Sequence, residues 1–158
     1  MADRKSILVI TELYPNVTNP ALGTFIVNQL RHLAQRYRVV VITPFLISIN
    51  QFGKISQPAI VNEHGIEVHY IPYYPKWLSL LHVVGIYNRD RFLATNKQIT
   101  GQKMMVMAKL LHTQQPFYLV VGHESYIGDE AIPIAAVLNI PSVFTLHSLY
   151  EYHLKSFG

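Results

Sequence analysis

The sequence predicts an α/β fold, a doubly wound three-layer sandwich built on a mostly parallel sheet. Short, continuously apolar runs recur along the chain, and segments with helical spacing separate them. A run that is apolar on both faces is typical of a strand buried between two helical layers. Strands that alternate with helices favour a parallel sheet. The chain has 158 residues, and 50% of them are hydrophobic, which suffices for one domain with a sizeable core.

The first predicted unit is a strand, a loop and a helix. An apolar run at Ile7–Thr11 is followed by a Pro- and Asn-rich loop over Glu12–Gly23. Apolar residues then recur at helical spacing over Phe25–Tyr37, so we expect an amphipathic helix there. Arg38–Thr43 is the next buried strand, and Pro44 is expected to end it. This order predicts a right-handed βαβ unit.

The middle of the chain is less regular. A turn is predicted at Asn62–Gly65, and Ile66–Ile71 alternates like a strand with one exposed face. Two helices are then expected, one over Leu78–Leu93 and one over Asn96–His112.

The last third predicts two more buried strands, Phe117–Val121 and Ser142–Leu146. Residues Asp129–Asn139 between them have a helical composition, with Asp129 expected to cap that helix and Pro133 indicating a late start or a kink. Together with the two earlier apolar runs, these strands are expected to form the centre of a parallel sheet.

Composition excludes several classes of protein. The chain has no cysteine, which excludes disulfides and thiolate metal sites, and a cytoplasmic location is compatible with that absence. The sequence contains no run of roughly 18 apolar residues, so it predicts no membrane-spanning helix. The net charge of +4 and a pI of 9.3 permit contact with phosphates or anionic lipid. No recognition motif supports nucleic acid as a partner, and both the dinucleotide fingerprint and the P-loop motif are absent.

Candidate functional residues follow the predicted strands. In a parallel sheet, ligands bind beyond the carboxyl ends of the strands. Gly23 lies just before a helix, where backbone N–H groups favour an anion, although a glycine needed only for a tight turn is the commoner case. His123 and His147 directly follow two strands and are candidates for acid–base work or for holding hydroxyls, with a structural histidine as the alternative. Glu12 and Glu124 lie beside them as candidate substrate ligands. No metal is expected, because neither histidine has a second ligand at metal-binding spacing.

A basic stretch at Lys76–Arg91 also contains Trp77 and several leucines and valines. Such a segment can lie on an anionic membrane surface. A helix packed on the sheet is the commoner alternative.

Four pieces of the sequence are informative together. In chain order they are Pro15–Phe25 with the helix Asn28–Ala34, Val39–Pro44, Val120–His123 and Ala135–His147. They resemble the N-terminal domain of a family 4 glycosyltransferase, the retaining group with the two-domain GT-B fold. The last piece is similar to the family's "lA…giP.v.t.Hg" pattern. Leu22 and Ser148 stand where the family usually has glycine.

The resemblance implies a Rossmann-like domain, one half of a GT-B fold, that holds the acceptor and faces a donor-binding domain. Gly23 would approach the diphosphate of a nucleotide-sugar donor through its backbone N–H. His147 would contact the transferred sugar near the reacting centre, and His123 would support the wall of the cleft. A sugar or lipid-linked acceptor is implied, no cofactor is, and the location would be cytoplasmic or peripheral at the inner face of the membrane.

The resemblance covers nearly the whole chain and implies that residues 1–158 form a single domain, which ends before the last strands of the family's N-terminal domain. The C-terminal donor domain is absent, so we expect the chain alone to be inactive. One alternative is a stand-alone subunit that binds an acceptor or recruits a split glycosyltransferase to a membrane. Another is an unrelated Rossmann-like nucleotide-binding protein such as a sugar-nucleotide epimerase, which the missing glycine fingerprint disfavours.

Overall fold

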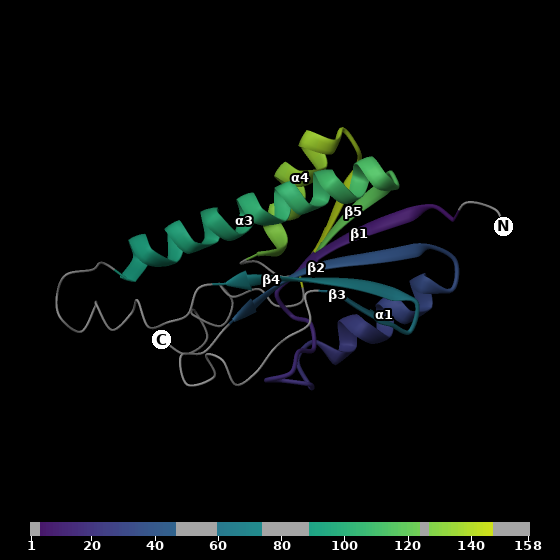
Figure 1. Cartoon of the computed structure of the whole chain (residues 1–158), viewed down its shortest axis with the longest axis horizontal. Coiled ribbons are helices and arrows are strands. Elements are labelled where there is room, and N and C mark those ends of the chain that lie inside the picture. Colours follow the sequence, from purple (N-terminus) through teal and green to yellow (C-terminus); the bar gives the residue numbers. More distant parts are fainter. Residues whose placement is uncertain (1–3, 47–59, 74–88, 124–126, 147–158) are drawn as a thin grey trace.

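The computed structural model describes residues 4–46, 60–73, 89–123 and 127–146 (Figure 1). Strands and helices alternate along most of this length. The elements are β1 (Ser6–Thr11), α1 (Thr24–Ala34), β2 (Arg38–Leu46), β3 (Ile60–Glu63), β4 (Ile66–Tyr73), α3 (Arg89–Gln114), β5 (Phe117–His123), the 3₁₀ turn η3 (Gly128–Glu130), α4 (Ala131–Leu138) and β6 (Ser142–Thr145).

The strands form one six-stranded sheet in the order β3-β4-β2-β1-β5-β6. Every neighbouring pair is parallel except the hairpin β3–β4. This arrangement confirms the predicted fold class, a Rossmann-like α/β sandwich with a mostly parallel sheet. Each of the segments predicted as strands coincides with a strand, except that Leu146 lies beyond the end of β6.

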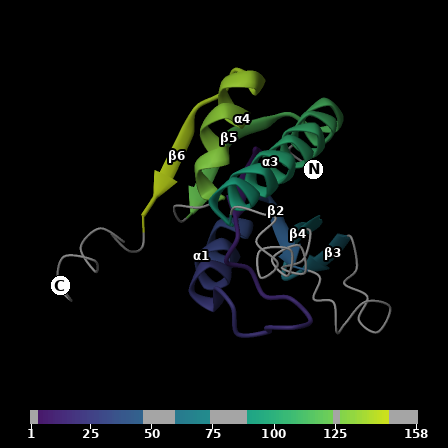
Figure 2. The ribbon, with the colours of Figure 1, turned by 90° about the vertical axis from the view of Figure 1, so that its left-hand side faces the viewer.

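Helices cover both faces of the sheet, which makes three layers (Figure 2). Helix α1 packs on one face through Ile26 and Leu30, and α3 and α4 pack on the other through Met104 and Ile134. Alternate residues of β1 enter the two cores, because successive side chains of a strand point to opposite faces. Burial on both faces explains why the central strands read as continuous apolar runs.

Strand β2 continues through Pro44 to Leu46, so the prediction that Pro44 ends it was wrong. The pairing of β1 with β2 stops at Ile10 and Ile42, whereas the pairing of β2 with β4 continues. Beyond Ile42 one side of β2 therefore has no partner strand among the described residues. A proline is tolerated at such an edge because it removes no ladder hydrogen bond there.

The prediction that Ser142–Leu146 is a central, buried strand was also wrong. Strand β6 lies at one edge of the sheet that the described strands form, and the side chain of Val143 is 51% exposed. Its apolar character resembles that of the buried strands, and sequence pattern alone does not reveal which strand lies at an edge.

Two helix predictions need correction. The expected break between residues 93 and 96 is absent, because α3 runs without interruption from Arg89 to Gln114 and no glycine or proline stands at the join. The part of the earlier helix prediction that falls on residues 74–88 lies outside the described residues. Near α4 no side chain caps a helix start, and Asp129 pairs with Lys97 instead.

The hairpin between β3 and β4 turns at His64 and Gly65, both of which have positive φ. This confirms the predicted turn. The expectation that one face of β4 is exposed was wrong, because α3 lies over the face that carries His69, which is 3% exposed.

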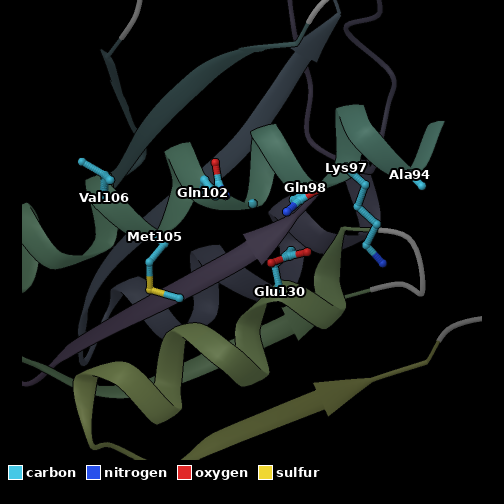
Figure 3. Close-up of a pocket in the computed structure, with 8 residues that line it drawn as sticks. Ala94, Lys97, Gln98, Gln102, Met105, Val106 and Glu130 are labelled. Atoms are coloured by element: carbon cyan, nitrogen blue, oxygen red, sulfur yellow. The ribbon is translucent and has the colours of Figure 1, made fainter. Parts of the chain in front are cut away.

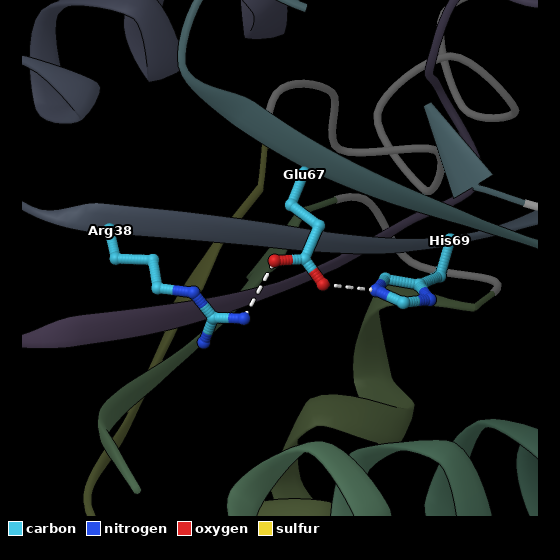
Figure 4. Close-up of polar contacts among 3 residues, drawn as sticks. All are labelled: Arg38, Glu67 and His69. Carbon is cyan, nitrogen blue, oxygen red and sulfur yellow. Dashed lines mark hydrogen bonds and ion pairs between the residues drawn. The ribbon is translucent and has the colours of Figure 1, made fainter. Parts of the chain in front are cut away.

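That face holds a short polar cluster within an otherwise apolar layer (Figure 4). Glu67 accepts a hydrogen bond from Nη2 of Arg38 at 2.6 Å, and its other oxygen lies 2.6 Å from Nε2 of His69. Burial alone would raise the pKa of Glu67. The hydrogen bond with His69 and the guanidinium of Arg38 outweigh burial and hold this pKa below its ordinary value.

We expect Glu67→Gln to lower the free energy of unfolding near pH 7 by about 2 kcal/mol, because charge-assisted hydrogen bonds to Arg38 and His69 are lost. The pKa of Glu67 is lowered by folding, so its stabilisation is present above the ordinary glutamate pKa and is lost as the pH falls through the folded-state value. Urea unfolding of the two proteins should therefore converge below about pH 4. Glu63→Gln, on exposed β3, is the matched control and should change little at either pH. An undiminished difference at low pH would show that the charge is not what matters.

Candidate functional site

The carboxyl ends of three parallel strands meet in one row. The register pairs Thr11 of β1 with His123 of β5, and His123 with Thr145 of β6. Each of these residues is two positions after a valine of its strand, and Val9 and Val121 pack in the core beneath α1. By strand alternation the row therefore faces the α1 side of the sheet. We call this row, together with the loop from Glu12 to Gly23, the carboxyl-edge site.

The loop of the carboxyl-edge site is held against the core. Tyr14 is buried at 3% exposure, and the Tyr70 hydroxyl on β4 donates a hydrogen bond of 2.7 Å to the carbonyl of Pro15. Tyr70 also packs edge-on against Phe45 of β2. Burial raises the pKa of Tyr70 to about 12, and it raises that of Tyr14 as well. Both phenols are therefore neutral at physiological pH.

Hydrogen bonds between neighbouring residues fix the conformation of the loop tip. The side-chain oxygen Oδ1 of Asn16 accepts hydrogen bonds from the backbone N–H groups of Thr18 and Asn19, each at 3.0 Å, and from the Thr18 hydroxyl at 2.6 Å. Asn16 and Asn19 also exchange two backbone hydrogen bonds. Asparagine commonly nucleates a turn in this way. The Pro- and Asn-rich segment thus has a defined shape that leads the chain back to the start of α1.

Gly23 closes the loop at the end of β1. It is the N-cap of α1 and has φ 63° and ψ 26°, in the left-handed region. A Cβ at this position would lie 2.1 Å from the carbonyl oxygen of Leu13, so the backbone of Gly23 touches the chain two residues beyond β1. Only glycine combines this conformation with this close approach.

The start of α1 has the electrostatic character of an anion site. No side chain forms a capping hydrogen bond there, and the first turn contains no acidic residue. The first backbone N–H groups of a helix carry partial positive charge, which attracts phosphates and carboxylates. The basic residues Arg31 and His32 lie at the other end, where they complement the negative pole.

The structure brings together three of the five candidate residues. Gly23 and half-buried Glu12 belong to the loop, and His123, 5% exposed, ends β5. The candidates Glu124 and His147 lie outside the described residues, as does the segment 74–88 of the basic stretch. His147 follows Thr145, the last residue of β6, by two positions.

Residues that the sequence analysis did not single out complete the carboxyl-edge site. The Thr11 hydroxyl accepts a hydrogen bond of 3.0 Å from the N–H of Leu13, and so turns the chain out of β1. A threonine at the end of an apolar run was a local signal for this role. Tyr70 gave no such signal, because its partner lies far away in the sequence.

Within the described ranges, no three His, Cys, Asp or Glu side chains lie close enough together to hold a metal ion. The groups that the carboxyl-edge site offers to a ligand are backbone N–H groups, an imidazole, a carboxylate and hydroxyls.

None of the helices described is both long enough and apolar enough to cross a membrane.

Comparison with models of known protein families gives no match, and no curated protein matches the chain.

We expect Gly23→Ala to destabilise the protein by about 3 kcal/mol, because it adds a left-handed alanine and a clash with the Leu13 backbone. Gly65→Ala is the matched control. Gly65 has φ 79°, but the nearest atom to an added Cβ is 3.8 Å away. Gly65→Ala should lower the free energy of unfolding by about 1 kcal/mol, which is the penalty of the left-handed backbone alone. Urea unfolding measures both, and equal losses would show that the contact with Leu13 is unimportant.

Tyr70→Phe should lower the free energy of unfolding by about 1 kcal/mol, because the Pro15 carbonyl loses its hydrogen-bond donor. The loop should also loosen locally, so the amide of Asn19 should exchange with deuterium faster than in the parent protein. Tyr118→Phe is the control, since Tyr118 is 53% exposed on β5 and should leave both quantities unchanged. Unaltered exchange at Asn19 in Tyr70→Phe would mean that the tyrosine does not anchor the loop.

Proposed function

We propose that this chain is the acceptor-side domain of a retaining glycosyltransferase, which transfers a sugar from a nucleotide-sugar donor to a sugar or lipid-linked acceptor. The observation that carries the proposal is the placement of Gly23. The uncapped start of α1 lies against the end of β1, at the edge of the sheet where His123 also ends its strand. The sequence resemblance assigns the donor diphosphate to this glycine.

The electrostatics of the α1 start suit the leaving group of such a reaction. During transfer, the bond between the anomeric carbon and the phosphate oxygen breaks, and a bond to the acceptor hydroxyl oxygen forms. The acceptor proton leaves with the departing phosphate or with a base. Negative charge therefore grows on the diphosphate. Backbone N–H groups that are already oriented toward it stabilise that charge without reorganising.

The remaining groups of the carboxyl-edge site suit a polyhydroxylated substrate. Glu12 and His123 can bind hydroxyl groups, as a carboxylate accepts hydrogen bonds and an imidazole both donates and accepts them. In the proposed enzyme His147 orients the transferred sugar, and Glu124 contributes to acceptor binding. A second domain supplies most of the contacts to the nucleotide, so the chain 1–158 does not transfer sugar alone.

The proposal predicts weak donor binding with a particular footprint. In calorimetry, UDP-sugars and GDP-sugars should bind this chain with a Kd of about 1 mM or weaker, because a single helix terminus offers few charge-assisted contacts. In ¹H–¹⁵N NMR spectra, millimolar UDP should shift the amides of Gly23, Thr24 and Phe25. Uridine, which lacks the diphosphate, should not.

The amide of Gly65 serves as the internal control. It lies in the β3–β4 turn, just before β4, and so at the amino end of the parallel strands, and should not respond. Micromolar affinity for a sugar nucleotide would place the donor site within this chain and overturn the proposed division of labour. Equal shifts with uridine would show that Gly23 does not approach a phosphate.

A further inference from the structure

A second site lies on the opposite face of the sheet, between α3 and the start of α4 (Figure 3). The two elements line an open hollow of about 650 Å³, a size typical of sites for small molecules. Glu130 lies beneath α3 in this view, with Gln98 and Met105 beside it on the helix, whereas Gln102 and Val106 point away. Most of the lining surface is hydrocarbon.

Gly101 is the reason that a carboxylate fits against the helix. It is buried in the middle of α3, and a Cβ there would lie 2.5 Å from Oε2 and 2.9 Å from Oε1 of Glu130. Glycine is unfavourable inside a helix, so its presence at this position needs a local reason. Close approach of the Glu130 side chain to the helix backbone supplies that reason.

Two carboxylates and one ammonium group lie around the hollow among the described residues. Lys97 is the cation of the lining, and its Nζ forms an ion pair of 2.5 Å with Asp129. In the described part of the chain, the Glu130 carboxylate has no ion pair of its own. Burial and the neighbouring Asp129 raise the pKa of Glu130, and Lys97 only partly opposes them. Lys97 and Glu130 of the lining, together with the neighbouring Asp129, carry one excess negative charge, in a chain whose net charge is +4.

We propose that this hollow binds a small primary amine in its protonated form, with the ammonium group at Glu130 and Gln98 and the hydrocarbon portion on Met105. An ammonium group presents three donors and no acceptor. The Glu130 carboxylate and the Gln98 amide oxygen provide acceptors, and the bound charge offsets the repulsion from Asp129. The thioether of Met105 adapts to an apolar chain. This site is separate from the carboxyl-edge site and does not depend on the proposed function.

The test compares n-pentylammonium with 1-pentanol, which has the same hydrocarbon chain and no charge. In ¹H–¹⁵N NMR titrations at pH 7, pentylammonium should produce saturable shifts at Gln98, Gly101, Met105 and Glu130. It should bind at least about tenfold more tightly than pentanol, as expected for a charge-assisted hydrogen bond. Equal affinity for pentanol, or shifts centred on other residues, would overturn the proposal.

Variants distinguish binding at the Glu130 carboxylate from nonspecific electrostatic attraction of a cation to the protein. Glu130→Gln should reduce the affinity for pentylammonium to that for pentanol, and Glu63→Gln, which removes an exposed carboxylate from β3, should leave it unchanged. Gln98→Ala, at a solvent-exposed position that lines the hollow, should weaken binding severalfold and leave the amide spectrum of the rest of the protein unaltered. Unchanged affinity in both Glu130→Gln and Gln98→Ala would refute the site. The UDP footprint at Gly23 is read from different amides, so either proposal can fail alone.

Discussion

Strand β1 is the element on which the rest of the structure depends. It is hydrogen-bonded to β2 on one edge and to β5 on the other, and its residues Ile7–Ile10 are at most 4% exposed. Its alternate side chains enter both cores, so neither helical layer packs without it. The same strand delivers Thr11 and Glu12 to the carboxyl edge. Stability and site geometry therefore share one constraint, since a register shift in β1 would exchange its core faces and displace the loop that ends at Gly23.

The fold was predictable from the sequence because its strands are buried on both faces. Ile7–Thr11 and Arg38–Thr43 have no polar alternation, and the helix between them has a clear amphipathic period. The errors occurred where the outcome depends on neighbours. Pro44 is tolerated only because β1 ends before it, and β6 lies at an edge only because no further described strand pairs with it. The position of a strand in the sheet and the length of its neighbours depend on the whole sheet, and the local sequence pattern does not indicate them.

The carboxyl-edge site was predictable where local rules apply. Gly23 precedes a helix and His123 follows an apolar strand, and the parallel topology brings these two positions to the same edge. The supports of the site were not predictable. Tyr70, which holds the loop through the carbonyl of Pro15, reads only as one residue of an alternating strand. The polar cluster on the opposite face of β4 was not predictable either, because the role of Glu67 comes from Arg38 on β2. Long-range polar contacts of this kind depend on the completed fold.

The hydrogen bond between Tyr70 and Pro15 joins residues that are 55 positions apart. Loop closure over such a distance is entropically costly and occurs late unless other contacts have already shortened it. The helix α1 and the turn at Asn16 need only nearby residues, but the loop reaches its final position only after β4 has joined β2. During synthesis from the N-terminus, the first loop of the chain would thus acquire its native shape only after β4 has been made. A ribosome-bound intermediate that lacks β4 would already contain β1 and α1, yet it would have no ordered approach to Gly23.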